Sequence, residues 1–338
     1  MARGGIGVVM LVVLSGCVTS QSQAPSVAPS AVTQTTQPYP ANPTLDRAER
    51  LLAGRRWQQA HDLTVPWLKS HPKAPDRDRG IFLLAEVYYQ SGDRIRSFYH
   101  LDELMDNYPE SRLFYPALEL QYEVADAYLR GYKLEFLGLP ILSGEDEAIE
   151  MLYRIQERSP GSPLAERALR RTADYYFNTS QFDLAADAYA AFARSYPRSP
   201  DIPQVKLRQA FASLAQFRGP RYDATPLIDA RAQFKDVQTR YPDLAAEANA
   251  AQWVEKIDAD LARKAYETGD YYRRTNHPRG AVYYYRYVIE TYPNSHEAAL
   301  ARRDLRRMPQ WAINQTPQPG ANTDEATTRP AVVPRLRK

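Results

Sequence analysis

The sequence predicts an all-α protein: an α-solenoid of about six helix-turn-helix repeats, flanked by disordered tails. Three observations predict it. A small residue followed twelve positions later by proline recurs six times, and apolar or aromatic side chains follow nearly every small residue at helical spacing. The segments outside these repeats are rich in Pro, Ser, Thr, Gln and Ala. With 338 residues, the chain is long enough for one extended repeat domain.

The N-terminus has the features of a secretory signal peptide. Arg3 precedes an apolar run over 6–14 that is too short to span a membrane as a stable helix. The tetrapeptide LSGC that ends at Cys17 resembles the lipobox of bacterial lipoproteins at all four positions. This resemblance implies cleavage before Cys17 and lipid attachment to it; Val18, in place of Asp, favours the outer membrane. The alternative is an ordinary signal peptide in which the cysteine is incidental.

Cys17 is the only cysteine, which excludes an internal disulfide and any CxxC site. The stretch that follows it has no charged residue up to Leu45, contains five prolines and cannot bury a core. The last residues, from about Pro309, have a similar composition and end in the basic sequence RLRK. We therefore predict four segments: a lipoprotein signal peptide over 1–16, a disordered tether over 17–44 from lipidated Cys17, a solenoid over 45–308 and a disordered C-terminal tail over 309–338.

The repeated unit contains one amphipathic helix that ends near a proline. The six small residues and their prolines are Ala60–Pro72, Ser97–Pro109, Ala148–Pro160, Ala185–Pro197, Ala230–Pro242 and Ala281–Pro293. The side chains four positions later are Thr64, Leu101, Leu152, Tyr189, Phe234 and Tyr285, and those seven later are Trp67, Leu104, Ile155, Phe192, Val237 and Val288. These spacings form one helical face, with the small residue at a close helix crossing.

Proline disfavours helical geometry in the residue before it, so it ends each of these helices. Serines two positions after four of the prolines are expected to cap the next helix. They are Ser111, Ser162, Ser199 and Ser295. Pro163 and Pro200 are then expected at the first helical position.

A second helix precedes the small residue in each repeat. In four copies its pattern is Ala48/Leu51, Ala85/Tyr88, Ala173/Tyr176 and Gly269/Tyr272. Together with the small-to-proline unit, this pattern resembles the tetratricopeptide repeat. The copies ending at Pro160 and Pro242 carry inserts near 131–144 and 218–226, and 295–308 forms a final capping helix.

The sequence contains no pattern that indicates an enzyme. The five histidines form no metal-binding motif, and no Gly-rich nucleotide loop follows the signal peptide. The acidic triplet 145–147 is interpreted as the first turn of a helix capped by Ser143. With 43 basic and 40 acidic residues, no nucleic-acid partner is implied. We expect no catalytic residue, no cofactor and no metal.

The first helix of each repeat is expected to line a peptide-binding groove. At the equivalent positions of these first helices, arginines alternate with aromatic residues, and a row of acids lies beside them. Arginine and aromatic side chains are common anchors of interfaces. The predicted groove residues are Arg79, Phe82, Tyr89, Arg167, Arg170 and Phe177; the acids are Glu49, Glu86, Asp174 and Asp270. The alternative is that the acids and arginines only pair between neighbouring repeats.

Lipobox, tether and long-period repeats together resemble the BamD family of outer-membrane assembly lipoproteins. The likeness covers roughly 45–308 and is closest in 261–295 and 170–200. It implies a lipid-anchored body facing the periplasm, with outer-membrane assembly subunits (BamA-like) and unfolded β-barrel proteins as partners. In this family the penultimate repeat often carries an Arg nine residues before its proline, associated with docking the barrel-insertase subunit; here Tyr284 occupies that position and Arg286 is the nearest arginine. The alternative is a scaffold lipoprotein of the cell-wall or division (Tol-Pal-like) apparatus.

Overall fold

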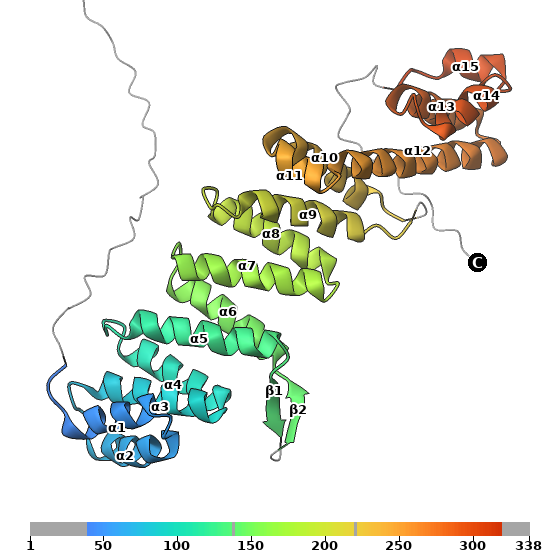
Figure 1. The fold of residues 1–338 in the computed structure, drawn as a ribbon. Helices are drawn as coiled ribbons and strands as arrows, with labels where there is room; N and C mark the ends of the chain where they lie inside the picture. The colour runs from blue at the N-terminus through green and yellow to red at the C-terminus, as the bar shows by residue number, and fades with distance from the viewer. Residues whose placement is uncertain (1–38, 137–138, 220–221, 320–338) are drawn as a thin grey trace, which may run out of the picture. The chain divides into compact units, whose positions relative to one another are not determined.

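The structure is a computed structural model that describes residues 39–136, 139–219 and 222–319. Figure 1 shows helices that follow one another in chain order, with one short hairpin. The elements are α1 (Pro43–Ala53), α2 (Trp57–Ser70), α3 (Arg77–Ser91), α4 (Arg94–Asn107), α5 (Phe114–Leu129), β1 (Lys133–Phe136), β2 (Leu139–Ser143), α6 (Glu145–Arg158), α7 (Pro163–Asn178), α8 (Phe182–Ser195), α9 (Ile202–Ala215), α10 (Thr225–Arg240), α11 (Pro242–Glu247), α12 (Ala250–Arg274), α13 (Pro278–Thr291), α14 (His296–Leu305) and α15 (Gln310–Gln315).

The predicted all-α solenoid is confirmed. Six helix pairs follow one another within the described residues: α1/α2, α3/α4, α5/α6, α7/α8, α9/α10 and α12/α13, with α14 after the last pair. From α1 to α14 each helix contacts the next, and first helices of neighbouring repeats also meet in the pairs α1 with α3, α5 with α7 and α12 with α14. None of the helices described here has the length and apolar character needed to cross a membrane.

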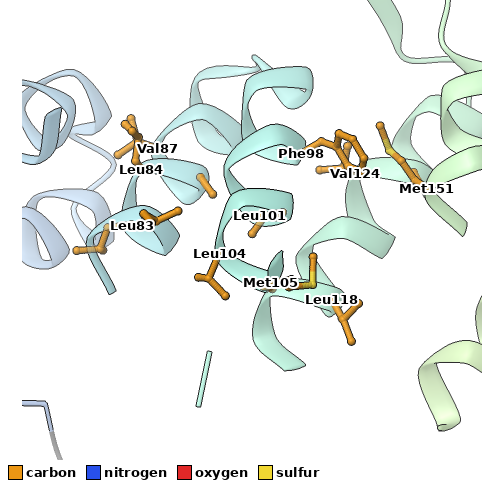
Figure 2. Close-up of a cluster of buried hydrophobic side chains, with 14 of the residues drawn as sticks. Leu83, Leu84, Val87, Phe98, Leu101, Leu104, Met105, Leu118, Val124 and Met151 are labelled. Carbon is orange, nitrogen blue, oxygen red and sulfur yellow. The ribbon is translucent and has the colours of Figure 1, made fainter. Parts of the chain in front are cut away.

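The repeated helical face is the core of the protein. All six predicted small residues are at most 1% exposed, and all six side chains four positions later are fully buried. The polar member of that set, Thr64, donates its hydroxyl to the Ala60 carbonyl at 2.8 Å and so leaves no buried donor unpaired. Figure 2 shows this packing along α3, α4 and α5, where Leu84, Leu101 and Val124 are among the buried side chains.

The six prolines end their helices in the same way. Each helix ends two residues before its proline, and the residue between them has φ of −124° to −138° and ψ of 55° to 64°. Because proline excludes helical geometry from the residue before it, one backbone conformation recurs whichever side chain occupies the position. These residues are His71, Tyr108, Ser159, Tyr196, Tyr241 and Tyr292.

Two of the four predicted serine caps are confirmed. The hydroxyls of Ser162 and Ser295 accept hydrogen bonds from the amides of Ala165 and Ala298 at 3.1 and 3.0 Å. The prediction was wrong for the other two, because α5 begins at Phe114 and α9 at Ile202, three residues after each serine. The hydroxyls of Ser111 and Ser199 instead accept from the amides of Leu113 and Asp201, and Pro200 precedes the helix rather than opening it.

A second correction concerns the start of α6. Ser143 belongs to β2, and Gly144 is the N-cap. A Cβ at Gly144 would lie 2.5 Å from Cδ1 of the Tyr128 ring, so only glycine fits at this position. Glu145–Glu147 form the first turn of α6, as predicted, where acids suit the helix dipole.

Both predicted inserts lie inside a repeat. The first forms an antiparallel hairpin between α5 and α6, in which Lys133 pairs with Ser143 and Leu134 with Leu142. This hairpin is an addition to the otherwise helical described chain. The second insert occupies the connection between α9 and α10.

The folded chain also continues beyond the boundary predicted at Met308. Residues 310–315 form α15, whose Ala312 is fully buried, so the prediction of a disordered tail needs correction for these residues. The signal peptide, Cys17 and the tether up to residue 38 lie outside the described residues, as does the end of the tail from residue 320. Their assignments stay predictions.

Candidate functional site

A groove of about 760 Å³ in the first two repeats is lined by residues that include predicted site residues. Its walls come from α1, α3, the segment that enters α5, and Tyr39 just before α1. Of the six predicted groove residues, Arg79 and Phe82 line it. We call this hollow the α1/α3 groove.

Arg79 ties the two first helices of the groove together. Its Nε donates to Glu49 Oε1 at 2.7 Å and its Nη2 to Asp46 Oδ1 at 2.7 Å. The side chain belongs to a residue that is only 8% exposed, and its hydrogen bonds to Glu49 raise the pKa of Arg79 further above its usual range. Arg79 is therefore fixed between α3 and α1 by two carboxylates, and its single positive charge compensates one of their two negative charges.

Glu86 lies two turns further along α3 and lines the same groove. It is half-buried, and among the described residues no hydrogen bond or ion pair reaches its carboxyl group. Burial, with a smaller contribution from the Glu49 charge, raises the pKa of Glu86 to about 7. At neutral pH this carboxyl group is thus divided between its charged and neutral forms.

The other end of the groove contains Tyr39 and Arg112. The Arg112 guanidinium lies 3.4 Å from the centre of the Tyr39 ring, and the Tyr39 hydroxyl donates to Asp78 at 2.6 Å. Burial, with the hydrogen bond to Asp78, raises the pKa of Tyr39 to about 12. Asp78 also accepts a hydrogen bond from Ser111, which joins α3 to the segment before α5.

The other four predicted groove residues lie elsewhere. Tyr89 packs beside Arg94, whose guanidinium is 5.0 Å from its ring, and Arg167 lies 4.5 Å above Tyr122. Arg170 forms ion pairs with Asp174 of its own helix and with Asp201, the N-cap residue of α9. Phe177 is half-buried, with Arg208 5.8 Å above its ring. Of the six predicted residues, the structure therefore brings Arg79 and Phe82 together in the α1/α3 groove, whereas Tyr89 and the three residues of α7 have other partners.

Arginine–carboxylate pairs recur between neighbouring repeats, as the alternative interpretation expected. Besides Arg79 with Asp46, Arg171 of α7 pairs with Asp126 of α5 at 2.6 Å. Arg208 of α9 pairs with Asp174 of α7 at 3.0 Å. Such pairs fix the register of adjacent first helices and need no ligand.

The row of acids differs in one member. Glu49 binds Arg79, Asp174 binds Arg208, and Asp270 binds Arg274 at 2.9 Å. Of these four acids only Glu86 has no basic partner among the described residues. The sequence pattern placed Glu86 in the row, but whether an arginine reaches it depends on where the neighbouring helix lies. Tyr39, Asp46 and Arg112 were missed as lining residues for the same reason.

A second hollow, of about 440 Å³, lies on α6 beside Tyr153. Its two arginines, Arg154 and Arg158, both bind Asp102 of α4, so their charges are already used. Across the described ranges, no three His, Cys, Asp or Glu side chains are placed to hold a metal ion. The α1/α3 groove is therefore the better candidate for binding.

Comparison with known proteins separates the two halves of the chain. Residues 143–310 match the family described as "YfiO: Outer membrane lipoprotein". The outer membrane protein assembly factor BamD of Caulobacter vibrioides is 22% identical over 145 residues, which are 43% of this chain and 48% of that protein. The chain thus matches about half the length of this curated relative. The α1/α3 groove lies before the region that matches the family.

Solved structures of repeat proteins also resemble the chain. A thermophilic tetratricopeptide-repeat protein of Thermus thermophilus is 18% identical, with a TM-score of 0.29, over 62% of this chain and 97% of its own. The C-terminal part of a tetratricopeptide-repeat protein of Cytophaga hutchinsonii is 13% identical, with a TM-score of 0.37, over 76% of this chain and 86% of its own.

Proposed function

We propose that this chain, a BamD-like protein with tetratricopeptide-like repeats, is a lipid-anchored periplasmic scaffold for the assembly of outer-membrane β-barrel proteins. The observation that carries the proposal is the match of α6–α14 to a family of outer-membrane lipoproteins. The LSGC sequence that ends at Cys17 supports the anchor. In this proposal Cys17 holds the protein on the outer membrane through its lipid, and assembly subunits dock on the repeats.

The repeats bind rather than catalyse in this proposal. Several arginines and carboxylates on the first helices pair with one another between repeats, and such pairs hold helices in register and offer no activated nucleophile. The α1/α3 groove and the separate α7 residues Arg167, Arg170 and Phe177 are the proposed contacts for segments of unfolded β-barrel proteins. An extended segment on such a surface is bound through a few anchor side chains.

The test is purification of the affinity-tagged full chain from solubilised membranes, with a Cys17→Ser variant beside it. We expect the unmodified chain to enrich a β-barrel assembly subunit and to stay in the outer-membrane fraction. The variant, which has no acyl chains, is expected to leave that fraction, because durable anchoring requires buried acyl chains. The variant also controls for enrichment that depends only on membrane fragments.

Two outcomes would count against the proposal. Enrichment of cell-wall or division proteins in place of assembly subunits would favour a scaffold of that apparatus. If the Cys17→Ser protein stayed on the membrane with an uncleaved terminus, the N-terminal segment would act as a signal anchor and not as a lipid-attachment site.

A further inference from the structure

We propose that the α1/α3 groove binds a basic side chain, arginine or lysine, of an extended partner polypeptide through Glu86. This inference deepens the proposed binding role and rests on it. It assigns a specific chemistry to a groove that lies before the region matched to the outer-membrane lipoprotein family.

The first step is the uncompensated carboxylate. Other acids of the same row are held by arginines of α3, α9 and α12, while Glu86 receives no basic partner from the described chain. A carboxylate removed from water without a partner is costly, and a cation within contact distance removes most of that cost. Glu86 therefore lacks the basic partner that Glu49, Asp174 and Asp270 each have.

The second step is the shape of the surface around Glu86. Phe82 and Glu86 stand four residues apart on α3, so they lie on one helical face, and both line the groove. Leu52 and Leu83, both at most 5% exposed, supply further apolar wall. Arginine and lysine combine a long apolar stem with a charged end, which matches an apolar wall that leads to a carboxylate. A guanidinium beside Phe82 also gains a cation–π contact.

The third step identifies the source of the cation. The charged groups that face Glu86 are Glu49 and Asp46 on α1 and Arg79 on α3, with Arg112 before α5. Arg79 is engaged by Glu49 and Asp46, and Arg112 lies over the Tyr39 ring. In the sequence, the stretch between Val18 and Leu45 contains no charged residue. Neither the lining groups nor this stretch supplies a cation to Glu86, and the proposal assigns it to another polypeptide.

The experiment measures binding of two labelled peptides to the purified full chain in detergent. One is acetyl-Ala-Tyr-Arg-Tyr-Ala-amide, and the other carries citrulline, the neutral isostere, in place of arginine. At about pH 8 we expect the arginine peptide to bind about tenfold more tightly, the value of one charge-assisted hydrogen-bonded contact. Glu86→Gln should abolish this preference. Glu123→Gln, which removes an exposed acid of α5 outside the groove, should retain it.

The preference should also fall as the pH is lowered to about 5, because Glu86 is then protonated and attracts no cation. Equal affinity of the two peptides for the unmodified chain would overturn the proposal, as would a preference that survives Glu86→Gln. Deletion of residues 320–338 tests whether the chain's own basic end occupies the groove. If the deletion raised the affinity for the arginine peptide about tenfold, the chain's own end would occupy the groove, and the proposal of a separate partner polypeptide would be wrong.

This measurement is independent of the assembly partners. A preference for arginine that depends on Glu86, together with no assembly subunit in the membrane purification, would refute the proposed function and support the groove chemistry. The opposite pair of results would refute the groove chemistry alone.

Discussion

Burial of Glu86 has a consequence for stability as well as for binding. An ordinary glutamate loses its proton near pH 4.5, whereas burial raises the pKa of folded Glu86 to about 7. Between these values the folded chain binds more protons than the unfolded chain, so the free energy of unfolding falls as pH rises. The unmodified protein thus carries a penalty that is absent below about pH 4.5 and complete above about pH 7.

Replacement by glutamine should remove that penalty. We expect Glu86→Gln to leave the free energy of unfolding nearly unchanged at about pH 4. At pH 8 it should raise that free energy by about 1–2 kcal/mol, after allowance for partial exposure. Urea denaturation at the two pH values measures the difference. Glu123→Gln should change stability little at either pH, and an effect of Glu86→Gln that does not depend on pH would contradict this account.

The residue scale also shows where sequence reasoning about the site stops. The row of acids could be predicted, because helical spacing alone places Glu49, Glu86, Asp174 and Asp270 in equivalent positions. The basic partner of each acid could not be predicted in the same way, because it depends on which arginine lies within reach in the folded chain. Arg79 was predicted as a ligand contact, yet its guanidinium donates to Glu49 and Asp46.

At the scale of one element, two backbone carbonyls of the α15 segment accept hydrogen bonds from one arginine of α13. Arg286 donates from Nη2 to the Ile313 carbonyl at 2.9 Å and from Nη1 to the Thr316 carbonyl. These carbonyls end α15, where a helix has no internal donors for them. The planar fork of arginine reaches both, and the single ammonium of lysine cannot reproduce that geometry.

We therefore expect Arg286→Lys to loosen α15 without disturbing α13. Amide hydrogen exchange over 310–316 should accelerate about fivefold to tenfold, which corresponds to about 1 kcal/mol of local stability. The buried positions Tyr285 and Val288 of α13 should keep their protection. Arg307→Lys, which changes an exposed arginine of the preceding segment, is the matched control. Unchanged exchange over 310–316 would show that Arg286 does not hold this helix.

The elements themselves were predictable where the signal is local. Helix faces follow from spacing, and helix ends follow from proline, so both agree with the structure. The cap prediction was wrong for Ser111 and Ser199. At Ser111 the reason is a tertiary contact, because its hydroxyl donates to Asp78 of α3 at 2.6 Å. Likewise α15 was missed because six residues carry no periodicity and depend on Arg279 and Arg286 of another helix.

At the scale of the whole molecule, contacts join mainly neighbouring helices, as in other repeat proteins. A core defect should then stay near its own repeat. Phe234 of α10 is fully buried and packs edge-on against Phe211 at 5.1 Å. We expect Phe234→Ala to lower the local free energy of unfolding around α10 by about 3–5 kcal/mol.

Amide hydrogen exchange along the chain measures how far that defect extends. Exchange should accelerate over α9, α10 and α12 and change little over α1–α4. Phe98→Ala in α4 is the reciprocal control and should reverse the pattern. Uniform acceleration over the whole chain in both variants would show that the repeats unfold as one unit.

The placement of the two inserts has a consequence for how this chain can change. Every junction between repeats is fixed by a proline and the residue before it, whereas the hairpin and the connection from α9 to α10 lie between the two helices of one repeat. Added sequence at these two connections does not enter a proline junction. The chain can therefore acquire new recognition segments at these connections while every junction keeps its geometry.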